Sequence, residues 1–355
     1  MCNFVDKISL HPESRNVDFT SFLKLIGLDH FNKKSILLFS NVNDINSNVL
    51  GIYLLKNDIT YIRINQDDFS NNFKTVLSIS NNDSSSKFQI SGDEFSAENV
   101  PLIFLRDFNL QNHLFSMDGF VNKFISEEWN NFLITLNRKL SCPWINSLES
   151  SNISADRFRV FQLATQSGFK IPDTIITNDG IEVKKFYIKH DKQIVVKVIS
   201  HHNFNSQGRT YSIYTHHFTD EDLPLLEFLR FSPCIFQKRI NHKKEVRVTI
   251  TGSDIFATEL DLTDKYTVVT DIHRLGVDNL KKKAISLSNE YEKKCINLIS
   301  SLGLVYGTID LLVGLDNQYY FLEVNSSGDW YWIEKETAQP ITQSIINTIK
   351  MRIKN

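Results

Sequence analysis

The chain has 355 residues, of which 41% are hydrophobic and 23% are charged, and its formal net charge at pH 7 is −2. This length predicts two or three domains, because a domain commonly takes about 150 residues. The balanced charge argues against a protein that binds nucleic acid over a wide surface. No apolar run approaches the roughly 20 residues of a membrane-spanning helix, so we expect neither nucleic acid nor a membrane as a partner.

The first residues and the cysteines bear on the compartment. Residues 1–16 include no apolar signal core, so we expect a cytoplasmic protein. Cys2, Cys142, Cys234 and Cys295 are widely scattered and form no CxxC pair. We therefore expect reduced structural thiols rather than disulfides or zinc ligands.

The first part of the chain predicts a parallel sheet. Residues 1–33 show no strong periodicity and are interpreted as an N-terminal extension. An apolar run at 35–40, a helical pattern at 49–55 and a strand pattern at 60–64 follow in that order. Strand, helix and strand in this order predict a parallel βαβ unit.

Three further elements are expected before residue 143. The stretch 71–91 is interpreted as a surface hairpin and 102–105 as another strand. Residues 119–140 carry apolar side chains at every third or fourth position, which predicts an amphipathic helix. We interpret its apolar stripe as part of the core.

A short linker at 143–146 is followed by mixed helices and strands. The expected helices are 155–167 with Ser154 as its cap, 287–302, and a closing helix at 334–350. The expected strands are 170–177 with a turn at 178–180, then 193–199, 234–240, 245–250, 254–260 and 266–269. Lys197 stands inside one of these apolar strands, where a lysine is costly to bury unless it meets an anion. It is therefore a candidate phosphate ligand.

The segment 304–325, LVYGTIDLLVGLDNQYYFLEVN, reads as two strands joined by a turn. If the turn is centred between Asp316 and Asn317, Asp310 lies opposite Glu323 on the neighbouring strand. This register would bring two carboxylates together on one face of the sheet.

Asn325 follows Glu323 by two positions and therefore projects from the same face. Two carboxylates this close need a cation, because like charges disfavour each other's ionisation. A set of hard oxygen ligands without His or Cys favours Mg²⁺, which commonly uses one or two carboxylates plus phosphate oxygens. The alternative is a solvated polar face of an edge hairpin.

Other residues of this part suit a nucleotide, although the sequence has neither a P-loop nor a GxGxxG motif. Gln237 and Lys238, just before Ile240, could offer side-chain and backbone groups to an adenine edge. Glu245 could hold a ribose, and Arg247, on the same strand face, could reach a phosphate or an acyl-phosphate. Positioning and charge neutralisation of this kind are most of what phosphoryl transfer requires.

These residues resemble the ATP-grasp ligases. The motifs Gly307-Thr-Ile-Asp310 and Phe321-Leu-Glu-Val-Asn325 are similar to the family's Mg²⁺-binding strands. Phe236-Gln-Lys-Arg-Ile240, followed by Glu245-Val-Arg247, is similar to its hinge and next strand. More narrowly, Ser326-Ser-Gly-Asp-Trp330 resembles the graspetide synthetases, the microviridin-type and grasp-with-spasm maturases of ribosomally made peptides. The resemblance extends from about residue 34 to the end of the chain.

The resemblance implies an α/β, ATP-grasp fold with the nucleotide held between two α+β subdomains, preceded by a parallel-sheet domain. The implied parts are the extension 1–33, a pre-ATP-grasp-like domain 34–142, a central subdomain 143–234 and a C-terminal subdomain 235–355 with the Mg²⁺ site. It also implies a homodimer.

The resemblance also assigns roles residue by residue. ATP contacts are implied at Arg157, Lys197, Gln237, Lys238, Ile240 and Glu245, and Mg²⁺ ligands at Asp310, Glu323 and Asn325. Arg247 would face the acyl-phosphate, and Arg274 would contact substrate or phosphate. The chain departs from the family in two places, since Arg157 stands where lysine is common and Asp107 follows Arg106 where an arginine pair is common.

The implied reaction uses ATP and Mg²⁺ to phosphorylate an Asp or Glu side chain of a ribosomal precursor peptide, which has a leader and an acidic core containing Thr, Ser or Lys. A Thr or Ser hydroxyl or a Lys amine then closes a macrolactone or macrolactam. One alternative is another ATP-grasp carboxylate–amine ligase that acts on glutamate or small amino acids. A second alternative is a nucleotide-binding module without catalysis.

Overall fold

The computed structural model describes residues 35–66, 73–90, 93–106, 108, 119–199, 203–206, 209–261 and 280–354. The expectations for 1–33, for a strand at 266–269 and for Arg274 lie outside these residues. The chain divides into two compact units. Unit 1 holds the described residues up to Ser147 together with those from Thr342 onward, and unit 2 is Leu148–Ile341. The four-part domain division expected from the sequence stays a prediction.

Unit 1 contains a parallel four-stranded sheet in the order β2-β1-β6-β7. The strands are β1 (Ile36–Ser40), β2 (Tyr61–Asn65), β6 (Ile103–Leu105) and β7 (Trp144–Ile145). Every residue of β1 is buried, as a strand covered on both faces requires. Helix α3 (Ile45–Lys56) joins β1 to β2, which confirms the predicted βαβ unit.

The stretch 143–146, predicted to be a linker, carries a strand instead. Residues 144 and 145 pair in parallel with Ile103 and Phe104. Their apolar side chains are buried, with 7% of Trp144 and 2% of Ile145 exposed. The favourable free energy of burying these apolar side chains explains why the chain forms a strand of the sheet here.

The remaining elements of unit 1 include an antiparallel sheet in the order β3-β4-β5. Its strands are β3 (Phe73–Ile79), β4 (Ser84–Ile90) and β5 (Asp93–Ser96), followed by the 3₁₀ helix η2 (Ala97–Asn99). The hairpin predicted at 71–91 is confirmed by the pairing of β3 with β4. The helix predicted at 119–140 is α5 (Gly119–Lys139).

The single closing helix predicted at 334–350 is two helices, α10 (Tyr331–Thr337) and α11 (Ile341–Lys354). Ala338 adopts a left-handed backbone, with φ of 55°, and ends α10. Pro340 follows, and a proline cannot donate the backbone hydrogen bond that a continuing helix needs.

Unit 2 begins with two helices rather than the one predicted at 155–167. They are α6 (Leu148–Ala155) and α7 (Arg157–Gln166). Asp156, not Ser154, caps α7, because its carboxylate accepts a hydrogen bond of 3.0 Å from the Arg159 amide. Gly168, with φ of 87°, ends α7 as predicted.

The first sheet of unit 2 is antiparallel, with the order β12-β9-β13-β8. Its strands are β8 (Thr174–Thr177), β9 (Ile194–Lys197), β12 (His216–Phe218) and β13 (Cys234–Lys238). Helix α8 (Gly180–Lys189) and the 3₁₀ helix η4 (Asp220–Phe231) pack on one face. A separate hairpin is formed by β10 (Asn203–Ser206) and β11 (Arg209–Ser212).

Helix α8 was not predicted, because Asn178-Asp-Gly180 was interpreted as a turn. The same residues start a helix, since Asp179 accepts a hydrogen bond of 2.8 Å from the Ile181 amide. Asp and Asn serve both turns and helix caps, so this short pattern does not separate the two.

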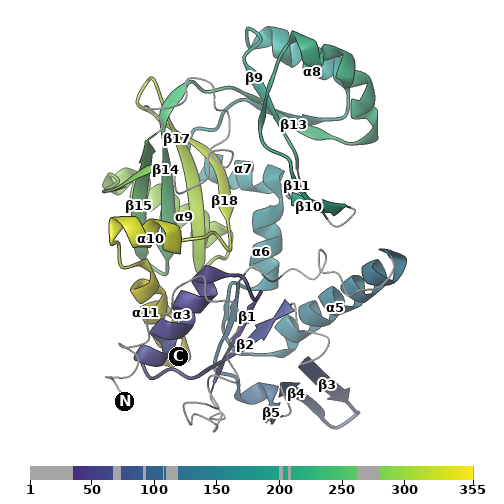
Figure 1. Cartoon of the computed structure of the whole chain (residues 1–355), viewed down its shortest axis with the longest axis vertical. Helices are drawn as coiled ribbons and strands as arrows, with labels where there is room; N and C mark the ends of the chain where they lie inside the picture. The colour runs from purple at the N-terminus through teal and green to yellow at the C-terminus, as the bar shows by residue number, and fades with distance from the viewer. Residues whose placement is uncertain are drawn as a thin grey trace. The chain divides into compact units, whose positions relative to one another are not determined.

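The second sheet of unit 2 has five strands in the order β16-β15-β14-β17-β18. They are β14 (His242–Thr251), β15 (Asp254–Asp261), β16 (Lys281–Ile285), β17 (Tyr306–Gly314) and β18 (Tyr319–Asn325). Helices α7 and α9 (Asn289–Ser301) close an apolar core on one face of this sheet. Figure 1 shows α10 on the side opposite to α9.

In the part of the chain that the structure describes, no helix combines the length and apolar character needed to cross a membrane.

Candidate active site

The hairpin of β17 and β18 brings the acidic residues together as predicted. Asp310 is paired with Glu323 in the strand register. The turn is closed by a hydrogen bond of 3.0 Å from the Gly314 amide to the Gln318 carbonyl, and Asn317 adopts a φ of 58°. The predicted pairing of Asp310 with Glu323 is therefore confirmed. The turn itself is centred on Asp316, because Val313 is paired with Tyr319, and not between Asp316 and Asn317 as predicted.

Asn325 joins the two carboxylates on the same face. Its Nδ2 atom lies 3.1 Å from Glu323 Oε1 and 3.5 Å from Asp310 Oδ2. A β-bulge after Asp310 shifts the pairing by one residue without moving Glu323 and Asn325 off this face. The result is a compact group of two carboxylates and one amide, which we call the acidic group.

Two arginines meet the acidic group from different elements. Arg157, the first residue of α7, places Nη1 3.0 Å from Glu323 Oε2. Arg247 on β14 places Nη1 3.2 and 3.1 Å from the two carboxylate oxygens of Asp310. Burial disfavours the charged form of Arg247, but the neighbouring negative charges, Asp310 foremost, outweigh it and raise its pKa. Both carboxylates therefore lie beside guanidinium groups.

The loop after Asn325 lies against Arg247. The Tyr306 hydroxyl donates a hydrogen bond to the Gly328 carbonyl, and Arg247 Nη2 donates one of 3.4 Å to the Asp329 carbonyl. A Cβ atom on Gly328 would lie 2.1 Å from Thr308 Oγ1 and 2.8 Å from Arg247 Nη2. Only glycine fits here, so residue 328 lets the backbone approach the arginine. The motif at 326–330 indicated this loop, whereas no sequence pattern pointed to Tyr306.

The two tryptophans after this loop have different surroundings. Trp330 is fully buried against the ring of Tyr306. Trp332 is partly exposed, and its ring centroid lies 5.8 Å from the Arg247 guanidinium and 5.4 Å from Lys282 Nζ. Trp332 therefore makes cation–π contacts with Arg247 and Lys282.

Three of the residues assigned to the nucleotide, Lys197, Gln237 and Lys238, lie on β9 and β13. Ile240 follows β13, which ends at Lys238 and not at residue 240 as predicted. Lys197 is the last residue of β9, opposite Ile235, and is partly buried. Gln237 is buried, and its Nε2 donates a hydrogen bond of 2.9 Å to Thr174 Oγ1. The Lys238 amide donates 2.8 Å to the Asp173 carbonyl, so this N–H group is used within the protein. The next amide, of Arg239, donates 2.9 Å to the Gln193 carbonyl and is likewise used within the protein.

Glu245, the candidate ribose ligand, is buried and lies beside a residue that the sequence analysis did not consider. His242 Nε2 lies 3.3 Å from Glu245 Oε1, and His242 Nδ1 lies 3.0 Å from the Ile240 carbonyl oxygen. Burial alone would lower the pKa of His242, but its bonds to Glu245 and to Ile240 outweigh burial and raise it. In the sequence, the only signal for this contact is that His242 stands three residues before Glu245.

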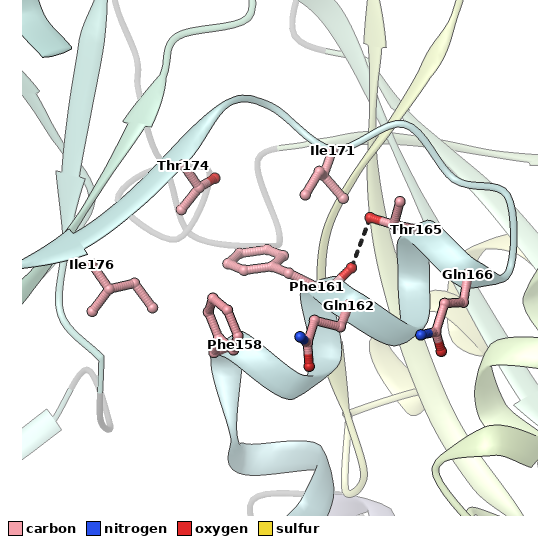
Figure 2. A pocket seen from close by; sticks show the side chains of 8 residues that line it. All are labelled: Phe158, Phe161, Gln162, Thr165, Gln166, Ile171, Thr174 and Ile176. Carbon is pink, nitrogen blue, oxygen red and sulfur yellow. Dashed lines mark hydrogen bonds between the residues drawn. The ribbon is translucent and has the colours of Figure 1, made fainter.

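An open pocket of about 360 Å³ lies between α7 and β8 (Figure 2). The lining is mainly apolar and consists of Phe158, Phe161, Gln162, Thr165, Gln166, Ile171, Thr174 and Ile176. Phe158 is 62% exposed, which is unusual for so large an apolar side chain. Thr174 is the residue that Gln237 contacts, so the pocket adjoins the strand assigned to adenine. No single stretch of sequence predicts it, because two elements form its walls.

Arg274 lies outside the described residues, and its role stays a prediction. Arg106 is in unit 1, where it is 1% exposed and its Nε lies 3.2 Å from Asp44 Oδ2. Asp44 caps α3, so Arg106 takes part in the buried hydrogen bonds at the start of that helix.

Residues 154–349 match the RimK-like ATP-grasp domain. The chain belongs to this family. The ATP-grasp fold expected from the sequence is thereby confirmed, and the matched residues include the acidic group, both arginines and the pocket.

Solved structures with the same fold include two peptide-modifying ligases. One is macrocyclase MdnC bound with precursor peptide MdnA from Microcystis aeruginosa MRC, at 24% identity and a TM-score of 0.79, covering 89% of this chain and 99% of that one. The other is a RiPP-associated ATP-grasp ligase of Chryseobacterium gregarium in complex with ADP and a leader and core peptide. It has 23% identity and a TM-score of 0.78, covering 90% of this chain and 97% of that one.

D-alanyl-alanine synthetase A from Vibrio cholerae is also similar, with 11% identity, a TM-score of 0.58, and coverage of 91% of this chain and 100% of that one. No curated protein sequence matches the chain. At these identities the solved structures establish the shared fold.

Proposed function

We propose that the protein is an ATP-dependent peptide macrocyclase. In this reaction a side-chain carboxylate of a ribosomal precursor peptide is phosphorylated by ATP and then joined to a Thr or Ser hydroxyl or a Lys amine of the same peptide. The observation that carries the proposal is the acidic group, which lies beside Arg157 and Arg247 within a RimK-like ATP-grasp domain.

The acidic group fits a cation that takes part of its coordination from phosphates. Asp310 and Glu323 supply carboxylate oxygens, and Asn325 can present its amide oxygen by rotating the terminal torsion. Among the described residues, no group of three or more His, Cys, Asp or Glu side chains is placed to hold a metal ion. Mg²⁺ commonly keeps waters and phosphate oxygens beside one or two carboxylates, so these three residues would hold it with the nucleotide. When bound, the ion neutralises the charge of the terminal phosphates.

The nucleotide contacts follow from the strands on which the residues lie. Lys197 and Arg157 would neutralise phosphate oxygens, and Glu245 would accept hydrogen bonds from the ribose hydroxyls. Gln237 and Lys238, at the end of β13, and Ile240, just after it, would contact the base. These assignments rest on the family and on the positions of the side chains in unit 2.

Two displacements make up the reaction. In the first, a carboxylate oxygen of the peptide attacks the γ-phosphorus of ATP, so ADP leaves and an acyl-phosphate forms. In the second, a hydroxyl or amine attacks the acyl carbon, loses its proton and expels phosphate, which forms an ester or amide. Arg247 would orient and neutralise the oxygens of the acyl-phosphate, because its guanidinium is held by Asp310 and by the Asp329 carbonyl.

A peptide is the preferred substrate class for two reasons. The solved structures of the Microcystis and Chryseobacterium ligases with this fold contain precursor, leader or core peptides. The pocket beside α7 offers an apolar surface of about 360 Å³, which suits an apolar peptide side chain. A cytoplasmic location, a homodimer and a phosphate or substrate contact at Arg274 remain part of this proposal.

The test is the intact mass of a short acidic peptide with Thr, Ser or Lys, encoded beside this gene, after incubation with protein, ATP and Mg²⁺. We expect the loss of one water per bond formed, abolished by Glu323→Gln. Glu182→Gln is the matched control, because Glu182 lies exposed on α8 and pairs with Lys185. An unchanged peptide mass, with ATP consumed when free amino acids are supplied, would instead favour a carboxylate–amine ligase for small substrates.

A further inference from the structure

His242 occupies a position between the end of β13 and the candidate ribose ligand. It is the first residue of β14, and only 14% of its side chain is exposed. One ring nitrogen faces the Ile240 carbonyl at 3.0 Å, and the other faces Glu245 at 3.3 Å. The imidazole therefore bridges the strand connection and the buried carboxylate.

Both atoms that face the ring are hydrogen-bond acceptors. A carbonyl oxygen and a carboxylate oxygen each need a donor, and a neutral imidazole has only one N–H group. The imidazolium form has two, so the geometry is fully satisfied only when His242 is protonated. In the neutral form, a nitrogen lone pair would face either Glu245 or the Ile240 carbonyl.

The charges around the ring agree with this geometry. Glu245 favours the protonated form, and Arg239 opposes it more weakly. Lys244, two residues after His242, places Nζ 2.8 Å from Glu259 Oε1. On β17, His242 is paired with Gly314, which carries no charge. Glu245 is therefore the group that most favours a charged His242.

We propose that protonated His242 is a positioning residue, which holds the Glu245 carboxylate in place to accept the nucleotide's ribose hydroxyls. This inference rests on the proposed function, because it assigns the ribose to Glu245. One carboxylate oxygen is fixed by His242, and the other is left to face the ribose. When His242 loses its proton, Glu245 no longer faces a charged imidazolium that donates to both acceptors, so the carboxylate is held less firmly and recognition of the ribose weakens.

The direction of the pH dependence follows from the raised pKa of His242, whose ordinary value is 6.5. Just above that pH the folded protein keeps the proton that the unfolded chain has lost. The pairing with Glu245 is therefore complete below about 6.5 and is lost as pH rises through the raised value.

The test compares the dissociation constants of ATP and 2′,3′-dideoxy-ATP by titration calorimetry on the full chain with Mg²⁺ and no peptide. The ratio of the two constants isolates the ribose hydroxyls, because titration of the phosphates affects both ligands alike. We expect dideoxy-ATP to bind about tenfold more weakly than ATP near pH 6, the factor for about 1.4 kcal/mol. Near pH 9 we expect the ratio to fall to about twofold.

Variants separate positioning from folding. His242→Gln supplies an amide donor that does not titrate, so its ratio is expected to stay constant with pH. His216→Gln is the matched control, since His216 is exposed and pairs with Asp222 on η4, and its ratio is expected to follow that of the unaltered protein. If ATP binds and the ratio of the unaltered protein does not change with pH, the inference on His242 is overturned. If ATP does not bind at either pH, the proposed function itself fails.

Discussion

The five-stranded sheet of unit 2 has two faces of opposite chemistry that are built from the same strands. On β14, Val246, Val248 and Ile250 point into the apolar core with α7 and α9. The alternate residues Glu245, Arg247 and Thr249 point to the other face and are also buried, with at most 8% exposed. Two-residue alternation therefore separates a stabilising face from a polar one within a single strand.

The polar face carries groups whose burial is costly. Arg247 Nε, Thr249 Oγ1 and Thr308 Oγ1 are buried polar atoms without a hydrogen-bond partner in the part of the chain that the structure describes. An unsatisfied buried polar group costs about 1–3 kcal/mol. A fold that keeps such groups on one face, while the opposite face is packed with aliphatic side chains, points to a functional constraint on the polar one.

The largest effect on stability and activity is expected from removing the guanidinium group of Arg247 on the polar face. Arg247→Met removes the guanidinium that pairs with the buried Asp310 carboxylate, which should lower the free energy of unfolding by about 3–5 kcal/mol. Cyclisation should also be lost. Adding Asp310→Leu to the same variant should recover much of the stability but none of the activity, as measured by urea unfolding and peptide mass. Recovered activity in the double variant would show that the pair is only structural.

A change on the apolar face should lower stability but leave the cyclisation activity of the folded protein intact. Leu298 on α9 is fully buried in the core, so Leu298→Ala should lower the free energy of unfolding by about 2–5 kcal/mol. Cyclisation per folded molecule, measured well below the unfolding transition, should stay near that of the unaltered protein. A large loss of activity at full folding would contradict the separation of the two faces.

The loop over Arg247 should be sensitive to a single methyl group. Gly328→Ala places a Cβ against Thr308 and Arg247, and overpacking of this kind typically costs about 1–3 kcal/mol. We expect a lower thermal midpoint and slower cyclisation together. Gly119→Ala is the control, since no described residue lies within 4 Å of a Cβ at that position. Equal effects of the two alanines would show that the close contact is unimportant.

The smallest effect on activity is expected from replacing Arg157, the first residue of α7, by lysine. Arg157→Lys keeps the positive charge beside Glu323 and restores the residue type common in the family, so activity should stay within about tenfold. Arg157→Ala removes the charge and should weaken ATP binding further than the lysine variant does, as measured by calorimetry. If alanine and lysine bind ATP equally well, the phosphate role of Arg157 is wrong.

Local patterns in the sequence predicted a large part of this structure. The βαβ unit, the α5 helix and the register of Asp310 with Glu323 depend on alternation and periodicity within short stretches. The start of α8 and the break between α10 and α11 were missed because short polar or helix-favouring stretches fit more than one local structure.

The site is less predictable because its contacts join distant residues. Arg157 and Glu323 are 166 positions apart, and Arg247 and Asp310 are 63 apart. The role of Tyr306, the space around Gly328 and the bridge made by His242 depend on how strands pair and how a loop packs. The family resemblance predicted which residues have roles in the site. The structure adds which of them contact one another.

The most direct test of the central claim is the fate of the oxygen atoms of the peptide carboxylates. A precursor peptide with Asp and Glu side chains labelled with heavy oxygen is incubated with the protein, ATP and Mg²⁺, and the released phosphate is analysed by mass spectrometry. The account predicts one labelled oxygen in phosphate for each ester or amide formed, because the acyl-phosphate passes that oxygen on when the ring closes. Cyclised peptide with no label in phosphate would contradict activation of the carboxylate by ATP.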